Sequence, residues 1–116
     1  MKKTLFYNWP LYVAVAVLLG LVWLTASVSI SQNQGHLVYA LDDAYIHMAI
    51  AKNLSQSHLW GVTRYGFTPA SSSIFWTLLL SLAFYLGGVN PLVPLLLNVT
   101  FAILVLIAAN AILSWY

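Results

Sequence analysis

Residues 11–30 read LYVAVAVLLGLVWLTASVSI, twenty consecutive positions without a charged side chain. As a helix with a rise of about 1.5 Å per residue, this stretch is roughly 30 Å long, which is the thickness of the hydrocarbon core of a membrane. Tyr7, Trp9 and Pro10 precede it. Aromatic residues suit the membrane interface, and proline suits the first turn of a helix. The stretch therefore predicts a first transmembrane helix at 11–30.

A cleaved signal peptide is the alternative interpretation of this end of the chain. Lys2 and Lys3 would form its positive region, and Thr25-Ala26-Ser27 offers small residues for cleavage. The apolar run is longer than the about 7–15 residues of a signal-peptide core, which favours a retained helix. By the positive-inside rule, the lysine pair predicts that residues 1–10 are cytoplasmic.

The composition of the whole chain also indicates a membrane protein. Hydrophobic residues make up 62% of the 116 residues and charged residues only 5%, whereas soluble domains carry roughly 25% charged residues. So few charges could not cover the surface of a soluble globule, and a disordered chain would be poor in apolar residues. The four Lys and Arg residues form no basic cluster, which argues against nucleic-acid binding. The absence of cysteine excludes disulfides, thiolate metal sites and cysteine nucleophiles.

Two further apolar segments follow. The segment at 71–89 reaches the lower limit of about 17 residues for a span only when the serines and glycines at its ends are included. Glycine and proline then predict a turn, and 90–116 is long enough for another span. The expected fold is therefore all-α, with three transmembrane helices. Because the last residues resemble a helix cut at the interface, we expect the N-terminal part of a longer polytopic domain, whose further helices, or those of a partner chain, pack against it.

A long segment at 31–70 joins the first two predicted spans, and the predicted orientation exports it across the cytoplasmic (inner) membrane. It interleaves aromatic and apolar residues, unlike a disordered linker. It holds both acidic residues of the chain, Asp42 and Asp43, and all three histidines. Residues 43–57 predict an amphipathic surface helix with Asp42 as its N-cap. Because long loops are commonly functional, we expect the chemistry of the protein here.

The adjacent acids allow two interpretations. One is structural, a helix cap with a favourable contact to the helix dipole. The other is functional: one carboxylate accepts a proton while the other binds a divalent cation or orients a neighbour. Acids beside a membrane are costly and commonly mark function. His47 follows Asp43 by one helical turn and is its predicted hydrogen-bond partner in a supporting role.

The remaining polar residues give weaker indications. Histidines spaced eleven residues apart match no metal-ligand motif, so no metal site is predicted from them. The sequence leaves open whether a divalent cation such as Mg²⁺ or Mn²⁺ is required, since carboxylates, water and phosphate could hold either. Lys52 and Arg64 could bind the phosphate of a substrate or, equally, lipid headgroups.

Four short motifs of this region resemble the first exported loop of the C-type glycosyltransferase superfamily, in particular its bacterial arabinosyl- and mannosyltransferase-like members. They are LDDAYI at 41–46, AKNL at 51–54, GFTPASSS at 66–73 and FWTLLL at 75–80. The resemblance extends from the first predicted span to the second. It implies a polytopic enzyme that transfers a sugar from a polyprenyl-phosphate donor, with inversion, as a carboxylate of this loop takes the proton of the acceptor hydroxyl.

The resemblance also implies residue roles. Asp42 and Asp43 match the acidic pair of the family, one as the base and the other as its support or as a metal ligand, and the choice between them stays open. Lys52 matches a usually basic position that would face the donor phosphate, whereas Ala49 stands where relatives often carry arginine. Family members are several hundred residues long, so a fragment of this size is not expected to be a complete enzyme. The alternative is a small non-enzymatic membrane subunit with three helices, or a remnant.

Overall fold

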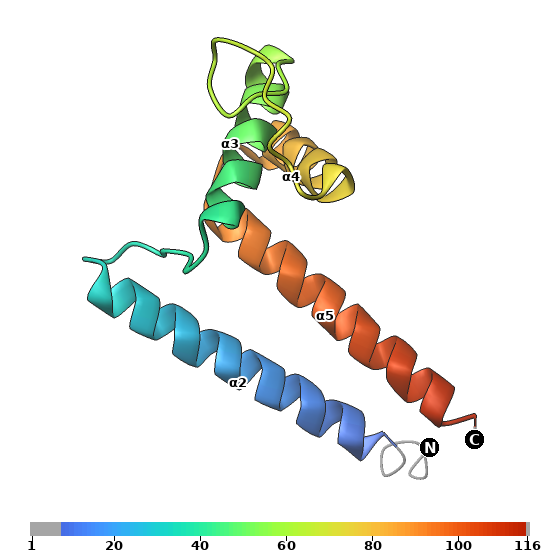
Figure 1. Cartoon of the computed structure of the whole chain (residues 1–116). Coiled ribbons are helices and arrows are strands. Elements are labelled where there is room, and N and C mark those ends of the chain that lie inside the picture. The colour runs from blue at the N-terminus through green and yellow to red at the C-terminus, as the bar shows by residue number, and fades with distance from the viewer. Residues whose placement is uncertain (1–7, 116) are drawn as a thin grey trace. The chain divides into compact units, whose positions relative to one another are not determined.

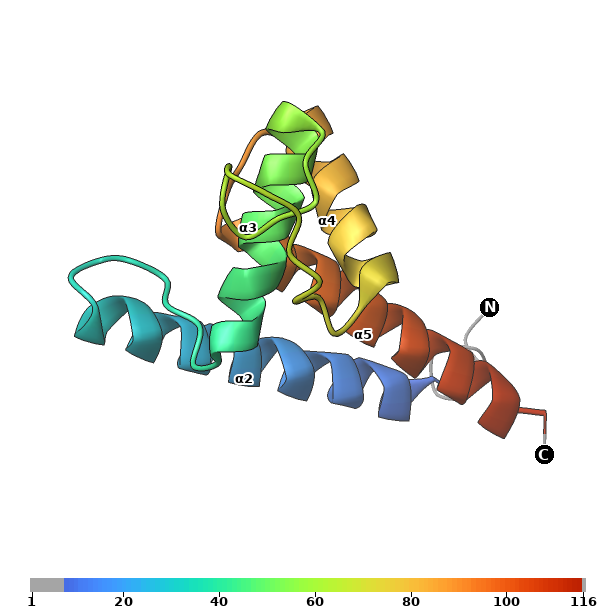
Figure 2. The same cartoon turned by 45° about the horizontal axis from the view of Figure 1, so that its top comes forward.

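The computed structural model describes residues 8–115, and this part of the chain forms four α-helices and no strand (Figures 1 and 2). The helices are α2 (Trp9–Gln32), α3 (Asp42–Ser57), α4 (Ile74–Gly87) and α5 (Leu92–Leu113). The prediction of an all-α fold is confirmed. The described chain divides into two compact units, one made of residues 37–95 and the other of residues 8–36 together with residues 96–115. Lys2 and Lys3, on which the predicted orientation depends, lie outside the described residues.

Helix α2 has the length and composition of a membrane span. It contains 24 residues, none of which is buried, and Trp23, for example, is 73% exposed. A core helix of a soluble protein would bury its apolar residues instead. Three hydroxyl groups within the helix donate to backbone carbonyls three or four residues earlier: Thr25 to Leu21, Ser27 to Leu24 and Ser31 to Val28, each at 2.9 Å. Such internal pairing is what a hydrocarbon environment requires.

Helix α5 is the second helix of this kind. Its start is shaped by Asn90, whose side-chain oxygen accepts a hydrogen bond from the backbone N–H of Leu92 at 2.9 Å, and by Pro94 in the first turn. Pro94 is also the only one of its 22 residues that is buried. Farther along, the amide of Asn110 donates to Asn8 at 3.1 Å. By length and composition, α2 and α5 are the two helices of the described chain that could cross a membrane.

The third predicted span, at 71–89, is not among them. Helix α4 has 14 residues, so it is only about 21 Å long and falls short of the hydrocarbon core. The serines and glycines counted into that span end the helix instead of extending it. The Ser73 side chain caps its start by accepting a hydrogen bond from Trp76 N at 3.4 Å, and Gly88, with φ of 83°, follows its last residue. The structure therefore has two candidate spans, not three.

Helices α3 and α4 pack against each other and form the core of the unit of residues 37–95. The buried apolar side chains come from both helices: Ile50 and Ala51 from α3, and Leu80 and Phe84 from α4. Burial of a side chain such as Ile50 or Leu80 stabilises the pair by about 1.5–3 kcal/mol. The predicted helix at 43–57 is present, but α4 covers its buried face.

The start of α3 differs from the prediction in one respect. Asp42 is the first residue of the helix, and Leu41 is the N-cap residue, with no side-chain hydrogen bond to the helix. The predicted capping role of Asp42 is therefore wrong. Both acids lie in the first turn, where the helix dipole favours a carboxylate.

The segment after α3 is held tightly to that helix. The chain leaves α3 at His58, which adopts the left-handed conformation with φ of 56°. The side-chain amide of Asn53, a buried residue, then donates to the carbonyl oxygens of Gly61 at 2.7 Å and Val62 at 3.1 Å. These bonds satisfy a buried polar group and fix the loop on the helix at the same time.

The same loop also closes on itself. The backbone N–H of Thr68 donates to the carbonyl of Trp60 at 3.0 Å. Gly61 lies so close to the carbonyl of Gly66 that an added Cβ atom would collide with it. The positions of Trp60 and Phe67, at the two ends of this loop, therefore depend on backbone contacts that tolerate only glycine at position 61.

Candidate functional site

The buried imidazole of His47 is the centre of a polar cluster between α3 and α4. Its side chain is only 5% exposed. Nδ1 lies 2.7 Å from the hydroxyl of Thr77, and Nε2 lies 3.0 Å from the hydroxyl of Ser72. Thr77 is itself fully buried and donates to the carbonyl of Ser73 at 3.0 Å. His47 therefore connects the first half of α3 with the start of α4.

Asp43 lies at the open edge of this cluster. Its Oδ2 atom is 3.4 Å from Nε2 of His47, so the two residues are neighbours, as the spacing of one helical turn predicted. The hydroxyl of Ser72 donates to the same carboxylate at 3.2 Å. Because its side chain is 57% exposed, Asp43 is reached by solvent on one side and held by Ser72 and His47 on the other.

Ser71 completes the cluster. Its hydroxyl lies 2.8 Å from that of Thr77 and 3.3 Å from Nδ1 of His47. The sequence interpretation missed the place of Ser71 and Ser72 in this cluster, although three consecutive serines before an apolar helix were a usable signal. Ser73 caps the helix, and the two serines before it flank the imidazole.

Two proton arrangements satisfy these contacts. If Thr77 donates to the Ser73 carbonyl, its oxygen accepts from Nδ1–H of His47. If Thr77 instead donates to Nδ1, the neutral imidazole carries its proton on Nε2, facing Asp43. The cluster thus accommodates either neutral tautomer of His47 by rotation of hydroxyl groups.

The cluster is not arranged as a serine-nucleophile triad. In such a triad one imidazole nitrogen faces the nucleophile and the other faces the carboxylate. Here Nδ1 is closer to Thr77, at 2.7 Å, than to Ser71, at 3.3 Å. The contacts suit the positioning of Asp43 better than the activation of a serine.

Asp42 differs from its neighbour. Its side chain is exposed, and among residues 8–115 it has no hydrogen-bond or ion-pair partner. Asp43, in contrast, is tethered to Ser72 and His47. The acidic pair therefore consists of one free carboxylate and one held carboxylate, a distinction that the sequence did not reveal.

The structure does not bring the predicted phosphate-binding residues to the acids. Lys52 is exposed on α3, ten residues after Asp42, and therefore about 15 Å farther along the helix axis. Arg64 is exposed in the loop that follows α3. In the described part of the chain, neither cation forms an ion pair with Asp42 or Asp43.

No cluster suited to a metal ion is found in the described region. Across residues 8–115, no three His, Asp or Glu side chains lie together as possible ligands. Asp43 and His47 alone form a pair, and structural metal sites take more protein ligands than that.

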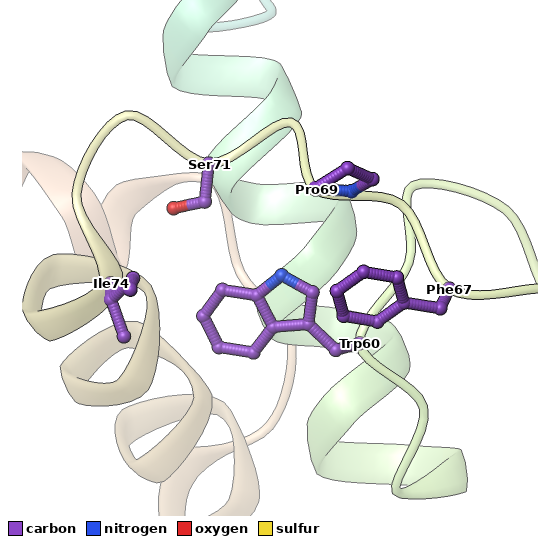
Figure 3. A pocket seen from close by; sticks show the side chains of 5 residues that line it. All are labelled: Trp60, Phe67, Pro69, Ser71 and Ile74. Carbon is purple, nitrogen blue, oxygen red and sulfur yellow. The ribbon is translucent and has the colours of Figure 1, made fainter.

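A pocket of about 420 Å³ adjoins the cluster. Figure 3 shows Trp60 at its centre, with Phe67 and Ile74 on opposite sides of the indole and with Pro69 and Ser71 along the segment that leads into α4. Four of these five lining side chains are apolar or aromatic, and Ser71 is the one with a hydroxyl group. Because Ser71 also contacts His47, it belongs both to the lining of the pocket and to the polar cluster.

The fold and site define an all-helical protein with two helices able to cross a membrane and a separate helical unit carrying an acidic pair. Comparisons with protein-family models, with curated proteins and with solved structures give no match for this chain. The functional argument therefore depends on the site itself.

Proposed function

We propose that this chain is the acid-bearing part of a membrane glycosyltransferase, which transfers a sugar from a polyprenyl-phosphate donor to an acceptor hydroxyl. The observation that carries the proposal is the unequal environment of the two adjacent acids. Asp43 is held by Ser72 and His47, whereas Asp42 is exposed and has no partner in the described chain. Neighbouring carboxylates with different surroundings are suited to different roles in one reaction.

In this proposal Asp42 is the general base. A base must come within hydrogen-bond reach of the proton that it removes, and an unpartnered carboxylate can do so without losing other contacts. Asp42 takes the proton of the acceptor hydroxyl while the acceptor oxygen attacks the anomeric carbon. The bond from that carbon to the phosphate oxygen breaks, and polyprenyl phosphate leaves with the electron pair. Asp43 supplies a fixed negative charge beside Asp42 and helps to orient the site, with His47 as its supporting partner.

The proposal places α2 and α5 in the lipid bilayer and the α3–α4 unit at the outer face of the cytoplasmic membrane. Support for the two spans comes from their length and from their almost complete lack of buried residues. Support for the outer face comes from Lys2 and Lys3, which favour a cytoplasmic N-terminus.

The test is sugar transfer in membranes that contain this chain, the further helices of the longer domain or partner chain predicted to pack against it, and a polyprenyl-phosphate-linked sugar. Asp42→Asn should lower kcat by about 10²–10⁴-fold, the contribution of a general base. Asp43→Asn should have a smaller effect, because it removes a positioning contact rather than the base. Full activity of Asp42→Asn would refute the assignment of the base, and absence of transfer by the unsubstituted chain would refute the enzyme.

A non-enzymatic membrane subunit is the second candidate function. The observation in its favour is the large apolar surface of α2 and α5, of which only Pro94 is buried in the described chain. Such a surface fits a partner helix as well as it fits lipid. A chain that transfers no sugar, but is recovered in a stable complex with one other membrane protein, would favour this alternative.

A further inference from the structure

We infer that the uncovered face of α4 rests in the lipid of the membrane interface, with the exposed side of α3 turned toward water. The inference goes beyond the proposed function, because it uses the proposed membrane location of the chain but not the proposed reaction. The uncovered face, which we call the α4 stripe, is defined by six exposed apolar or aromatic side chains: Ile74, Phe75, Leu78, Leu82, Tyr85 and Leu86.

The α4 stripe is continuous along the helix. At about 100° per residue, its six side chains fall within about 120° of arc around the helix axis. The buried residues of α4 are on the opposite side, and two of these four, Thr77 and Ser81, are polar. A surface helix of a soluble protein buries its apolar side and exposes its polar side. Small polar residues toward a neighbouring helix are instead typical of helices that pack in lipid.

Helix α3 presents a surface of the opposite character. Apart from Tyr45, its exposed side chains are charged or polar: Asp42, Asp43, Lys52, Gln56 and Ser57. The two helices lie side by side (Figures 1 and 2) and pack their buried faces against each other, so their uncovered faces point apart. The pair is therefore amphipathic as a unit. An amphipathic element lies in the plane of the interface, with its apolar side at the boundary of headgroups and acyl chains.

The position of α4 in the chain brings the stripe to a membrane. Gly87 ends α4 and Leu92 begins α5, which is one of the two helices able to cross a bilayer. The four residues between them can extend over at most about 18 Å. With α5 in a bilayer, the end of α4 is therefore held near the membrane surface. The 14 residues of α4 are too few to cross the hydrocarbon core, but they can lie along its surface.

The composition of the stripe favours lipid over a protein partner. Protein interfaces combine an apolar centre with a polar rim, and they contain about one hydrogen bond per 100–200 Å². Among the six side chains of the stripe, the phenol of Tyr85 is the only polar group, and none is charged. Tyr85 lies in the last turn of α4, and tyrosine is enriched at the boundary between acyl chains and headgroups.

The experiment uses site-directed spin labels, because the 116 residues contain no cysteine that would react as well. Leu78→Cys and Leu82→Cys report on the stripe, and Lys52→Cys and Gln56→Cys are matched controls at exposed positions of α3. The chain is placed in lipid nanodiscs together with the further helices or partner chain predicted to pack against it, in which any cysteine is replaced by serine. Power-saturation EPR compares how often each label collides with oxygen, which concentrates in lipid, and with a water-soluble nickel chelate.

The labels on the two helices should differ in sign. Those at Leu78 and Leu82 should collide more with oxygen than with the chelate, at a depth of about 5–10 Å. Those at Lys52 and Gln56 should show the opposite preference. A label introduced by Leu104→Cys, near the middle of α5, calibrates the depth scale at roughly 15 Å, half the thickness of the hydrocarbon core. A circular dichroism spectrum equal to that of the unsubstituted chain shows that each variant is folded.

Three results would overturn the inference. Greater access of the chelate to the labels at Leu78 and Leu82 would mean that the stripe faces water. Low access of both reagents would mean that protein, either a further helix or a second copy of this chain, covers it. A depth equal to that of the Leu104 label would make α4 an inserted helix instead of an interfacial one.

The readout is separate from sugar transfer, so the two proposals can fail independently. If the stripe lies in lipid but no sugar is transferred, the proposed function fails and the interfacial position of α4 stands. If transfer depends on Asp42 but the stripe faces water, only the interfacial position fails.

Discussion

The α3–α4 unit and the helices α2 and α5 satisfy the hydrogen-bonding groups of their polar side chains in opposite ways. In the α3–α4 unit, polar side chains such as His47, Asn53 and Thr77 are buried and pair with groups from another element. In α2 the hydroxyl groups of Thr25, Ser27 and Ser31 pair with the backbone of their own helix, and no side chain is buried. The first arrangement can position reactive side chains, because hydrogen-bond partners from different elements converge on them. The second provides only a surface for lipid or for other helices.

The largest expected effect concerns the core of the α3–α4 unit. Leu80 is fully buried, so Leu80→Ala should lower the free energy of unfolding by about 2–5 kcal/mol through lost burial and the cavity left behind. Leu82→Ala is the matched control, because Leu82 is 55% exposed on the same helix. Urea unfolding followed by near-UV circular dichroism measures both. Equal losses would show that α4 does not bury one face against α3.

The next prediction tests the exposed surface of α5. Leu104, which is 53% exposed near the middle of that helix, should not tolerate arginine if the helix crosses a bilayer. The cost of insertion should rise by about 2.5–3.5 kcal/mol, measured as the inserted fraction of an α5 reporter segment. Gln56→Arg, at an exposed position of α3, should leave the level of folded protein in membranes unchanged. Normal insertion of Leu104→Arg would argue against α5 as a span.

The polar cluster itself is tested by replacing its central imidazole. His47→Leu leaves Thr77, Ser72 and Asp43 without a shared partner, and should cost about 1–3 kcal/mol of stability. His36→Leu is the control, because His36 is exposed. Chemical unfolding measures the stability, and the KM and kcat of transfer report on positioning. If His47→Leu and His36→Leu lose the same stability and have the same KM and kcat, the contacts of His47 neither stabilise the unit nor position Asp43.

The smallest expected effect is at the segment that leads into α3. The hydroxyl of Tyr39 donates to the carbonyl of Pro91, and its ring packs edge-on against Tyr45 at a centroid distance of 6.1 Å. Tyr39→Phe removes the hydrogen bond and should cost about 1 kcal/mol, measured by chemical unfolding at neutral pH.

The same residue predicts a dependence on pH. Burial raises the pKa of Tyr39 above its ordinary value of 10.0, so folding favours the neutral phenol. This contribution is complete below pH 10.0 and is lost as the pH rises through the raised pKa of the folded state. The unsubstituted chain should therefore lose its advantage over Tyr39→Phe in alkaline solution, when unfolding is measured from neutral to strongly alkaline pH. A constant difference across this range would show that the phenol is not desolvated.

The sequence predicted most of the helical content. The span at 11–30 and the helix at 43–57 were recognisable because length, hydrophobicity and helical spacing are local properties. The contact of Asp43 with His47 followed for the same reason, since one turn of helix brings the two residues together. The prediction of a span at 71–89 was wrong, because capping by Ser73 and the turn at Gly88 shorten α4. Apolar composition alone does not show where a helix ends.

By itself, therefore, the sequence determined an all-helical chain with two long apolar helices and an acidic pair at the start of a third helix. Only the tertiary structure decided which acid is held and which is free, because Ser72 is 29 residues from Asp43 and reaches it only when α4 packs on α3. The Trp60 pocket likewise depends on packing, because the loop closed by the Thr68–Trp60 bond and the first residue of α4, Ile74, both line it. Helical periodicity encodes contacts one turn apart, whereas contacts across tens of residues arise only from packing.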